Sequence, residues 1–383
     1  MSGVSGNIIK AVLPATLDRL RLALSAAKDG LVDRGVLVDL ILLAAVAGEH
    51  ALVIGPPGTA KSQAVRRIAA SLGGRYFEYL LGRFTEPNEV FGPVDLSRLR
   101  EGVVETLTTG MLPEAEIAFL DEVFQGSSAI LNTLLGILQE RRFRRGLTTM
   151  DCPLRICVAA SNQLADDPAL DAFADRFLLR IFVDRVEDPR LEELLESGWQ
   201  LRDRLEAVAG IADLAAVGAA AAVVDLTAVR PLLASALRQL RGAGIRLSDR
   251  RAVKCQSLIA AAAALDGRNT ATPADLWPIL YAIPTREQQS LAQDLLREAL
   301  HHSDSATLPA AAEEASAGPL TKARRIADCG LSLLANKPSP DGAMWRLQLE
   351  GVAREIDASF PAAGLPDGLV SLRSRIVEEL AKP

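Results

Sequence analysis

Residues 55–62 combine the residue types and the spacing that bind a polyphosphate. They read Gly-Pro-Pro-Gly-Thr-Ala-Lys-Ser, which fits the pattern Gly-x4-Gly-Lys-Ser/Thr except that Ala60 stands at the second glycine. In such a loop backbone N–H groups surround the phosphates, the ammonium of Lys61 meets the β and γ oxygens, and the hydroxyl of Ser62 meets Mg²⁺. The next helix directs its positive N-terminus at the same anion. The sequence therefore predicts a nucleoside triphosphate site formed by Gly55, Pro56, Pro57, Gly58, Thr59, Ala60, Lys61, Ser62 and Gln63.

The segments on either side of this loop favour a phosphate site over an ordinary Gly/Pro turn. Residues 51–54 are an apolar run typical of a buried strand, and residues 62–72 place Val65, Ile68 and Leu72 at the spacing of a helix with one buried face. Alanine is acceptable at position 60 where it adopts helical dihedral angles, because only the left-handed conformation favours glycine. We therefore expect a helical Ala60.

A second apolar run, residues 117–120, ends in the two carboxylates of Asp121 and Glu122. Phosphoryl transfer to water needs a neutralised triphosphate and an oriented nucleophile. Asp121 would hold Mg²⁺, together with Ser62, and Glu122 would orient and deprotonate the attacking water. A solvated acidic turn after an ordinary strand is the alternative, and the pairing with the loop at 55–62 disfavours it.

Polar residues at three further points could complete a site for phosphoryl transfer. Asn162 follows the apolar run 154–160, where its amide could hydrogen-bond the γ-phosphate and the lytic water; a turn or helix-capping residue is the alternative. Arg176 could add positive charge to the transition state, supplied in oligomeric ATPases by a neighbouring subunit. Arg250 and Arg251, at the start of a later helix, could reach the same phosphate. The sequence alone does not choose between them.

The order of the expected elements predicts an α/β fold. Strands are expected at 51–54, 75–81, 117–120, 154–160 and 178–183, with helices at 62–72 and 127–141 between them. This alternation indicates a parallel sheet covered by helices on both faces. Ligands bind such sheets beyond the carboxyl ends of the strands, where Gly55, Asp121 and Asn162 would all lie.

Four regions are expected along the chain. Residues 1–188 would form the nucleotide-binding αβα domain, and residues 189–300, rich in Leu, Ala and Arg, an all-helical domain. Residues 301–320 contain Ala, Ser, Pro and Glu without a clear period and are expected to form a linker. Helices at 321–334, 344–359 and 366–381 would make up a small C-terminal region.

Composition bounds the class of protein. The 383 residues suggest two or three domains, and the net charge of −6 with a pI near 5.4 argues against nucleic acid as the main partner. Cys152, Cys157, Cys255 and Cys329 show no metal-ligand spacing, so we expect buried free thiols in a reducing compartment. No apolar stretch is long enough to span a membrane. These observations predict a cytoplasmic protein without membrane insertion.

Several motifs resemble those of the MoxR family of AAA+ ATPases, and most closely its RavA branch. The matching stretches are residues 82–93, 110–115, 119–122, 130–135, 139–144, 160–162 and 248–251. The loop Gly-Pro-Pro-Gly-x-Ala-Lys-Ser is also typical of that branch, so Ala60 supports the resemblance. The likeness extends over about residues 30–285 and fades beyond them.

The resemblance implies an AAA+ αβα module followed by a helical lid, in a ring that is usually hexameric, with ATP and Mg²⁺ as cofactors. Asp121 and Glu122 match the Walker B pair, Asn162 matches sensor 1, and Arg176 matches the arginine finger acting on a neighbour. Arg250 matches the sensor 2 arginine, with Arg251 next to it. Residues 94–109 and 142–151 match two hairpin inserts that face the pore or the client.

The expected function is ATP-driven remodelling or maturation of a protein client, because members of the family commonly act with partners that carry a von Willebrand factor A domain. One alternative is a nucleotide-gated scaffold that hydrolyses slowly while assembling a signalling or defence complex. Another is a DNA motor, for which Arg141, Arg142, Arg144 and Arg145 form a basic cluster. The acidic overall charge disfavours the DNA motor.

Overall fold

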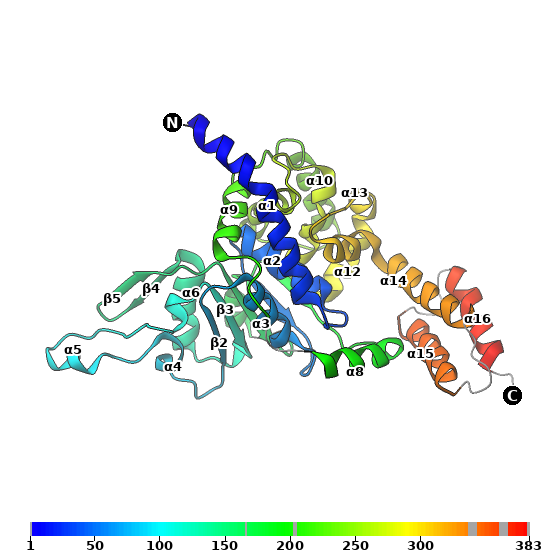
Figure 1. Cartoon of the computed structure of the whole chain (residues 1–383), viewed down its shortest axis with the longest axis horizontal. Coiled ribbons are helices and arrows are strands. Elements are labelled where there is room, and N and C mark those ends of the chain that lie inside the picture. Colours follow the sequence, from blue (N-terminus) through cyan, green and yellow to red (C-terminus); the bar gives the residue numbers. More distant parts are fainter. Residues whose placement is uncertain (1, 165–166, 202–204, 336–342, 360–366, 381–383) are drawn as a thin grey trace.

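A five-stranded parallel sheet forms the centre of the computed structural model, which describes residues 2–164, 167–201, 205–335, 343–359 and 367–380 (Figure 1). The strand order is β2-β3-β6-β1-β7, and every neighbouring pair is parallel. The strands are β1 (Ala51–Ile54), β2 (Tyr76–Leu80), β3 (Ile117–Asp121), β6 (Ile156–Ser161) and β7 (Leu179–Phe182). The predicted α/β parallel-sheet fold is therefore confirmed.

The strands divide their side chains between two cores, as the period of two in a strand requires. In β1, Ala51 and Val53 face one core while Leu52 and Ile54 face the other. Helices on the first face are α1 (Ser2–Lys28), α2 (Gly35–Ala47) and α3 (Lys61–Leu72). Helices on the second face are α4 (Pro87–Phe91), α6 (Ser128–Glu140) and α7 (Pro168–Ala174). Helices thus cover both faces of the sheet, and polar groups can gather at the ends of its strands.

The helical lid shares the first core with the sheet, so these two parts have no separate cores. A 3-10 turn η3 (Asp188–Arg190) and helix α8 (Leu191–Gln200) connect the sheet to it. Its helices are α9 (Ile211–Ala221), α10 (Arg230–Gly242), α11 (Asp249–Leu265), α12 (Arg286–Leu295) and α13 (Arg297–Leu300), with 3-10 turns η4 (Pro273–Asp275) and η5 (Trp277–Ala282). Trp277 is fully buried in the shared core. Movement of the lid would therefore disturb packing that reaches the sheet.

The linker expected at 301–320 is wrong, because helix α14 (Pro309–Ala335) begins within it. Ala311, Ala312 and Ala315 are buried against the first core, and the N–H of Ala311 donates to the buried carboxylate of Asp39 at 3.3 Å. Alanine allows close helix packing but adds little to a hydrophobic period, which is why the segment looked irregular. α14 then runs outward to α15 (Ala343–Ser359) and α16 (Asp367–Leu380), where a third, small core forms (Figure 1).

Two inserts project from the sheet and lie side by side (Figure 1). The second is the expected hairpin, β4 (Arg142–Arg145) with β5 (Thr148–Asp151). The first, expected as a hairpin at 94–109, instead contains helix α5 (Leu96–Arg100) and one antiparallel bridge, Val94 to Thr106. The 3-10 turns η1 (Leu112–Glu114) and η2 (Val123–Gln125) flank β3. The N–H of Leu147 donates to the Val104 carbonyl at 3.1 Å, which joins the tips of the inserts.

Three cysteines, Cys152, Cys157 and Cys255, are free and buried, as the sequence predicted for them. The side chain of Cys329 lies outside the described residues. No helix in the described ranges is both long enough and apolar enough to cross a membrane.

Candidate functional site

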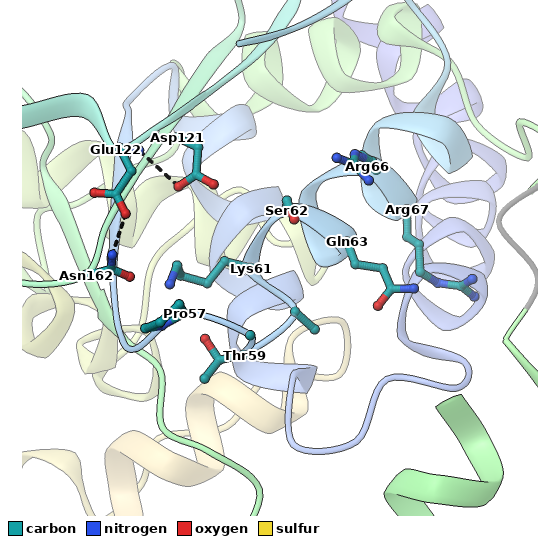
Figure 2. Close-up of a pocket in the computed structure, with 12 residues that line it drawn as sticks. Pro57, Thr59, Lys61, Ser62, Gln63, Arg66, Arg67, Asp121, Glu122 and Asn162 are labelled. Atoms are coloured by element: carbon teal, nitrogen blue, oxygen red, sulfur yellow. Dashed lines mark hydrogen bonds between the residues drawn. The ribbon is translucent and has the colours of Figure 1, made fainter. Parts of the chain in front are cut away.

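A cavity of about 670 Å³ opens at the carboxyl ends of β1, β3 and β6. Figure 2 shows Lys61 extending toward the side of this cavity where Asp121, Glu122 and Asn162 lie. The residues that line it are Pro57, Gly58, Thr59, Ala60, Lys61, Ser62, Gln63, Arg66, Arg67, Asp121, Glu122 and Asn162. The structure therefore brings together the predicted loop, the acidic pair and the asparagine.

The loop after β1 is closely packed against the end of β7. A Cβ atom on Gly55 would lie 2.2 Å from the Val183 carbonyl oxygen, so only glycine fits at this point. The ammonium of Lys61 donates to the carbonyls of Gly55 and Pro56 at 2.6 and 2.9 Å. Burial lowers the pKa of Lys61, and the carboxylates of Asp121 and Glu122 oppose that shift. The lysine is thus held over the loop, beside the carboxylates.

Ala60 is left-handed, with φ 58° and ψ 26°, which corrects the helical conformation expected for it. An L-residue with a Cβ pays about 1–2 kcal/mol in this region relative to glycine. The local sequence did not predict the left-handed conformation. The residue before Ala60 accepts a hydrogen bond from Arg34, which is distant in sequence.

Asp121 is the last residue of β3 and Glu122 follows it, and both line the cavity (Figure 2). Glu122 is also left-handed, with φ 49°, which turns its carboxylate toward Asn162. The Asn162 Nδ2 donates to Glu122 Oε1, and the Glu122 N–H donates to Asp121 Oδ1 at 3.0 Å. Burial, followed by the charge of Asp121, raises the pKa of Glu122. A carboxylate with raised proton affinity beside an oriented amide suits a general base.

Ser62 and Asp121 both line the cavity and offer a hydroxyl and a carboxylate oxygen. Mg²⁺ prefers oxygen ligands and usually keeps waters and substrate phosphates in its remaining positions. The two residues fit a magnesium ion held jointly with a bound triphosphate, and their role as magnesium ligands stays a prediction.

Arg176 lies at the opposite edge of the sheet from this cavity. It precedes β7, and the first residue of β7, Leu179, is in register with Ala51 at the start of β1. The loop at 55–62 begins only after β1 ends, so four strand residues, about 13 Å at 3.3 Å each, separate the two levels. Arg176 is half-buried, and an ion pair of 3.8 Å joins it to Asp175. It cannot serve the phosphate loop of its own subunit.

Arg250 and Arg251 begin α11 at that same distant edge, so neither reaches the cavity of its own subunit. Arg251 is buried, and its guanidinium donates to the carbonyls of Ala282, Phe177 and Leu178 at 2.6–3.1 Å. It fastens the lid to the start of β7. Arg250 makes no hydrogen bond or ion pair within the described parts of the chain, and its charge, after burial, lowers the pKa of Arg176.

Arg34 was not predicted from the sequence, and it contacts the loop from outside the cavity. Its Nε donates to the Thr59 carbonyl at 2.8 Å, and its side chain is buried. The one signal available was an arginine placed immediately before the apolar helix α2.

Two arginines of the basic cluster expected for DNA form ion pairs within the chain. Arg142 pairs with Asp151 at 2.8 Å and Arg144 pairs with Glu140 at 3.1 Å. Arg145 donates to the Gly92 carbonyl at 3.0 Å, and Arg141 donates to that of Gly48 at 2.7 Å. The ion pairs compensate the charge of Arg142 and Arg144, whereas Arg141 and Arg145 keep their charge but are held against the protein by carbonyl oxygens.

The parallel sheet, the helical lid and the phosphate loop define the AAA+ ATPase class. Two family comparisons agree: residues 18–217 match the "MoxR domain in the MoxR-vWA-beta-propeller ternary systems", and residues 224–294 match an AAA lid domain. The first match covers more than half of the chain. The chain therefore belongs to the MoxR family of AAA+ ATPases.

Individual relatives fit this assignment. Two uncharacterized proteins of Methanocaldococcus jannaschii are 36% and 37% identical over 62% of the chain, which spans 64% and 63% of their lengths. Chaperone MoxR1 of Mycobacterium tuberculosis is 26% identical over 50% of the chain and 54% of its own length. A crystal structure of an ATPase candidate from Cytophaga hutchinsonii aligns with a TM-score of 0.64 at 16% identity, over 77% of this chain and 98% of that one. The last likeness shows the fold.

Proposed function

We propose that the chain hydrolyses ATP with Mg²⁺ in an oligomeric ring, usually hexameric in this class, and uses the cycle to remodel or mature a protein client. The observation that carries this proposal is the cavity that gathers Lys61, Asp121, Glu122 and Asn162 around the loop. Lys61 and the loop N–H groups bind the phosphates, and Ser62 with Asp121 holds Mg²⁺. Glu122 activates water, and Asn162 orients it against the γ-phosphate.

The positions of the arginines support the proposed ring. Phosphoryl transfer places extra negative charge on the γ-phosphate, which arginine side chains commonly stabilise. Arg176 and Arg250 lie together at the edge away from their own cavity, and two neighbouring positive charges repel unless an anion joins them. A neighbouring subunit's triphosphate supplies that anion when the far edge of one subunit faces the cavity of the next. Arg250 then takes the sensor 2 role, and Arg251 remains structural.

The family description supports a partner with a von Willebrand factor A domain and, with it, a β-propeller protein. The loop with Ala60 supports the likeness to the RavA branch. The paired inserts expose apolar side chains at their tips, with Leu96 69% and Leu147 72% exposed, and these fit contacts with a protein client. The buried free cysteines support a cytoplasmic location.

Replacement of the proposed general base, Glu122, distinguishes an ATP-driven remodelling enzyme from a nucleotide-gated scaffold that hydrolyses slowly. The Glu122→Gln variant should bind ATP and hydrolyse it about 10²–10⁴-fold more slowly than the wild type, because the amide cannot accept a proton. Steady-state phosphate release measures the rate. Glu116→Gln is the control, because Glu116 immediately precedes β3, outside the cavity, and accepts the Arg75 N–H. Equal turnover, or equal inertness, in wild type and Glu122→Gln would refute the proposed hydrolysis by Glu122.

The same variant identifies the client. Held in the ATP state, Glu122→Gln should retain its partner longer than wild type does, so a pull-down with ATP should enrich a protein with a von Willebrand factor A domain. Enrichment that is the same with ADP, or that also occurs with a Lys61→Ala control, would argue against ATP-dependent client binding.

A further inference from the structure

Arg34 occupies an unusual position for a buried arginine. It lies between α1 and α2, is 4% exposed, and does not line the cavity. Each of its three guanidinium nitrogens donates to a backbone carbonyl: Nε to Thr59 at 2.8 Å, Nη1 to Asp33 at 2.8 Å, and Nη2 to Asp184 at 2.7 Å. The side chain therefore links the phosphate loop to the segment that follows β7.

The bond to Thr59 fixes the peptide unit that joins Thr59 to Ala60. In a trans peptide the C=O and the N–H point in opposite directions. Thr59 and Ala60 line the cavity while Arg34 does not, so Arg34 draws the carbonyl outward and leaves the Ala60 N–H facing the cavity. That N–H is one of the donors with which a loop of this type surrounds a phosphate.

The same peptide precedes the left-handed residue of the loop. Glycine reaches the left-handed region about as readily as the right-handed one, whereas alanine does not. With φ 58° at Ala60, the loop keeps a conformation that its own sequence disfavours. The contact from Arg34 is the one that holds the adjacent carbonyl in place, and it is supported in turn because Arg286 of the lid binds the Asp184 carboxylate, with 2.7 Å between Nη1 and Oδ1.

We propose that Arg34 is a positioning residue that compensates for the absence of the second glycine. It holds the Thr59–Ala60 peptide, so that the loop already has the conformation that binds phosphate. Arg34 does not touch the phosphate, because its donors are used on backbone carbonyls. This inference rests on the proposed nucleotide binding at residues 55–62.

A double-mutant cycle tests it, with Mg²⁺-ADP affinity of the full chain measured by calorimetry. Arg34→Lys keeps the charge and loses the three-way contact, and it should weaken ADP binding about tenfold, the factor that modest backbone strain supplies. Combined with Ala60→Gly, the same change should cost less than about threefold, because glycine reaches the conformation unaided. Equal losses in both backgrounds, or no loss in either, would overturn the proposal.

Arg67 provides the matched control. Its Nε and Nη2 also donate to backbone carbonyls, those of Ala26, Ala27 and Asp29 at 2.8–3.1 Å, but these carbonyls belong to the end of α1 and its connection rather than to the phosphate loop. Whatever affinity Arg67→Lys loses should be the same with alanine or glycine at position 60. Recovery of Arg67→Lys by glycine would show that Ala60→Gly acts generally, and would overturn the specific role of Arg34.

Ala60→Gly alone tests the proposal even if Arg34→Lys does not fold. With Arg34 intact the loop is already preset, so glycine should change ADP affinity by less than about twofold. Tightening by more than about fivefold would mean that the alanine loop is not preset, and would overturn the inference. Wild-type chain that binds no nucleotide would instead refute the proposed function, which is a separate outcome.

Discussion

The two ends of the strands of the central sheet carry different charged side chains. We call them the carboxyl-terminal edge and the amino-terminal edge. At the carboxyl ends of the strands, Lys61 faces the carboxylates of Asp121 and Glu122 across an open cavity. At the amino ends, Arg176 and Arg251 both pair with Asp175, and the buried Arg180 has its pKa lowered to about 9 by desolvation and by the charge of Arg251. Lys61 is the cation that the first edge offers to a γ-phosphate, and the second edge holds Arg176 and Arg250, which do not line the cavity of their own subunit.

The difference fits the proposed ring, in which a neighbouring subunit would bring Arg176 to the cavity. Two non-glycine residues with positive φ, Ala60 and Glu122, lie at the carboxyl-terminal edge, and a third, Arg141, bonds to Gly48 before β1 at the amino-terminal edge. Strain of this kind persists where the surroundings fix it, and it commonly marks functional sites. At the amino-terminal edge the buried Arg251 donates hydrogen bonds to carbonyls of several segments, which favours rigidity. A rigid edge suits a residue that must be presented to a neighbour.

The largest expected effect comes from removing the cation at the amino-terminal edge. Arg176→Ala should lower ATP hydrolysis by about 10³-fold, the contribution typical of an arginine finger. It should leave ATP affinity nearly unchanged, because Arg176 lies outside the cavity of its own subunit. Phosphate release and equilibrium nucleotide binding measure the two quantities separately.

Mixing then tests whether the site is shared. Lys61→Ala subunits bind nucleotide poorly but carry an intact Arg176, whereas Arg176→Ala subunits have the opposite defect. A mixture of the two should recover activity that neither has alone. If no ratio of the two restores any hydrolysis, the finger does not act across subunits.

A smaller effect should distinguish the two adjacent arginines of α11. Arg251→Met leaves the carbonyls of Ala282, Phe177 and Leu178 without their donor, so we expect the free energy of unfolding to fall by about 3 kcal/mol. Arg250→Met, at a half-exposed position without such bonds, should change it by less than about 0.5 kcal/mol and lower hydrolysis instead. Urea unfolding measures both. Equal stability of the two variants would contradict the division of roles.

The sequence predicted the carboxyl-terminal edge better than the amino-terminal one, and the reason is physical. Gly55, Asp121 and Asn162 each end an apolar run, so local pattern and strand direction sufficed to bring them together. The conformation of Ala60 depends on Arg34, which is distant in sequence, and no local pattern reports that contact. Arg251 looked like part of a charged helix start, because hydrogen bonds to carbonyls from other segments leave no signal in the sequence around it.

The smallest effect uses pH to separate the edges. His50, fully buried before β1, accepts the Cys157 N–H at Nδ1 at 3.0 Å, and its Nε2 lies 3.1 Å from the Leu138 carbonyl. Burial, and then the charge of Arg141, lower the pKa of His50 well below its usual value. His50 therefore binds a proton near pH 6.5 in the unfolded chain but stays neutral in the folded chain at that pH. Its contribution to the free energy of unfolding is fully present above pH 6.5.

As the pH falls from 6.5 toward the lowered pKa of folded His50, unfolding should become easier by about 1 kcal/mol over the first pH unit. His50→Gln removes this proton uptake and should flatten the dependence of unfolding free energy on pH in that window, while His301→Gln, at an exposed position, should not. Because His50 lies at the edge that presents Arg176, mild acid should loosen that edge first. An unchanged slope in His50→Gln would place the acid sensitivity elsewhere and remove this distinction between the edges.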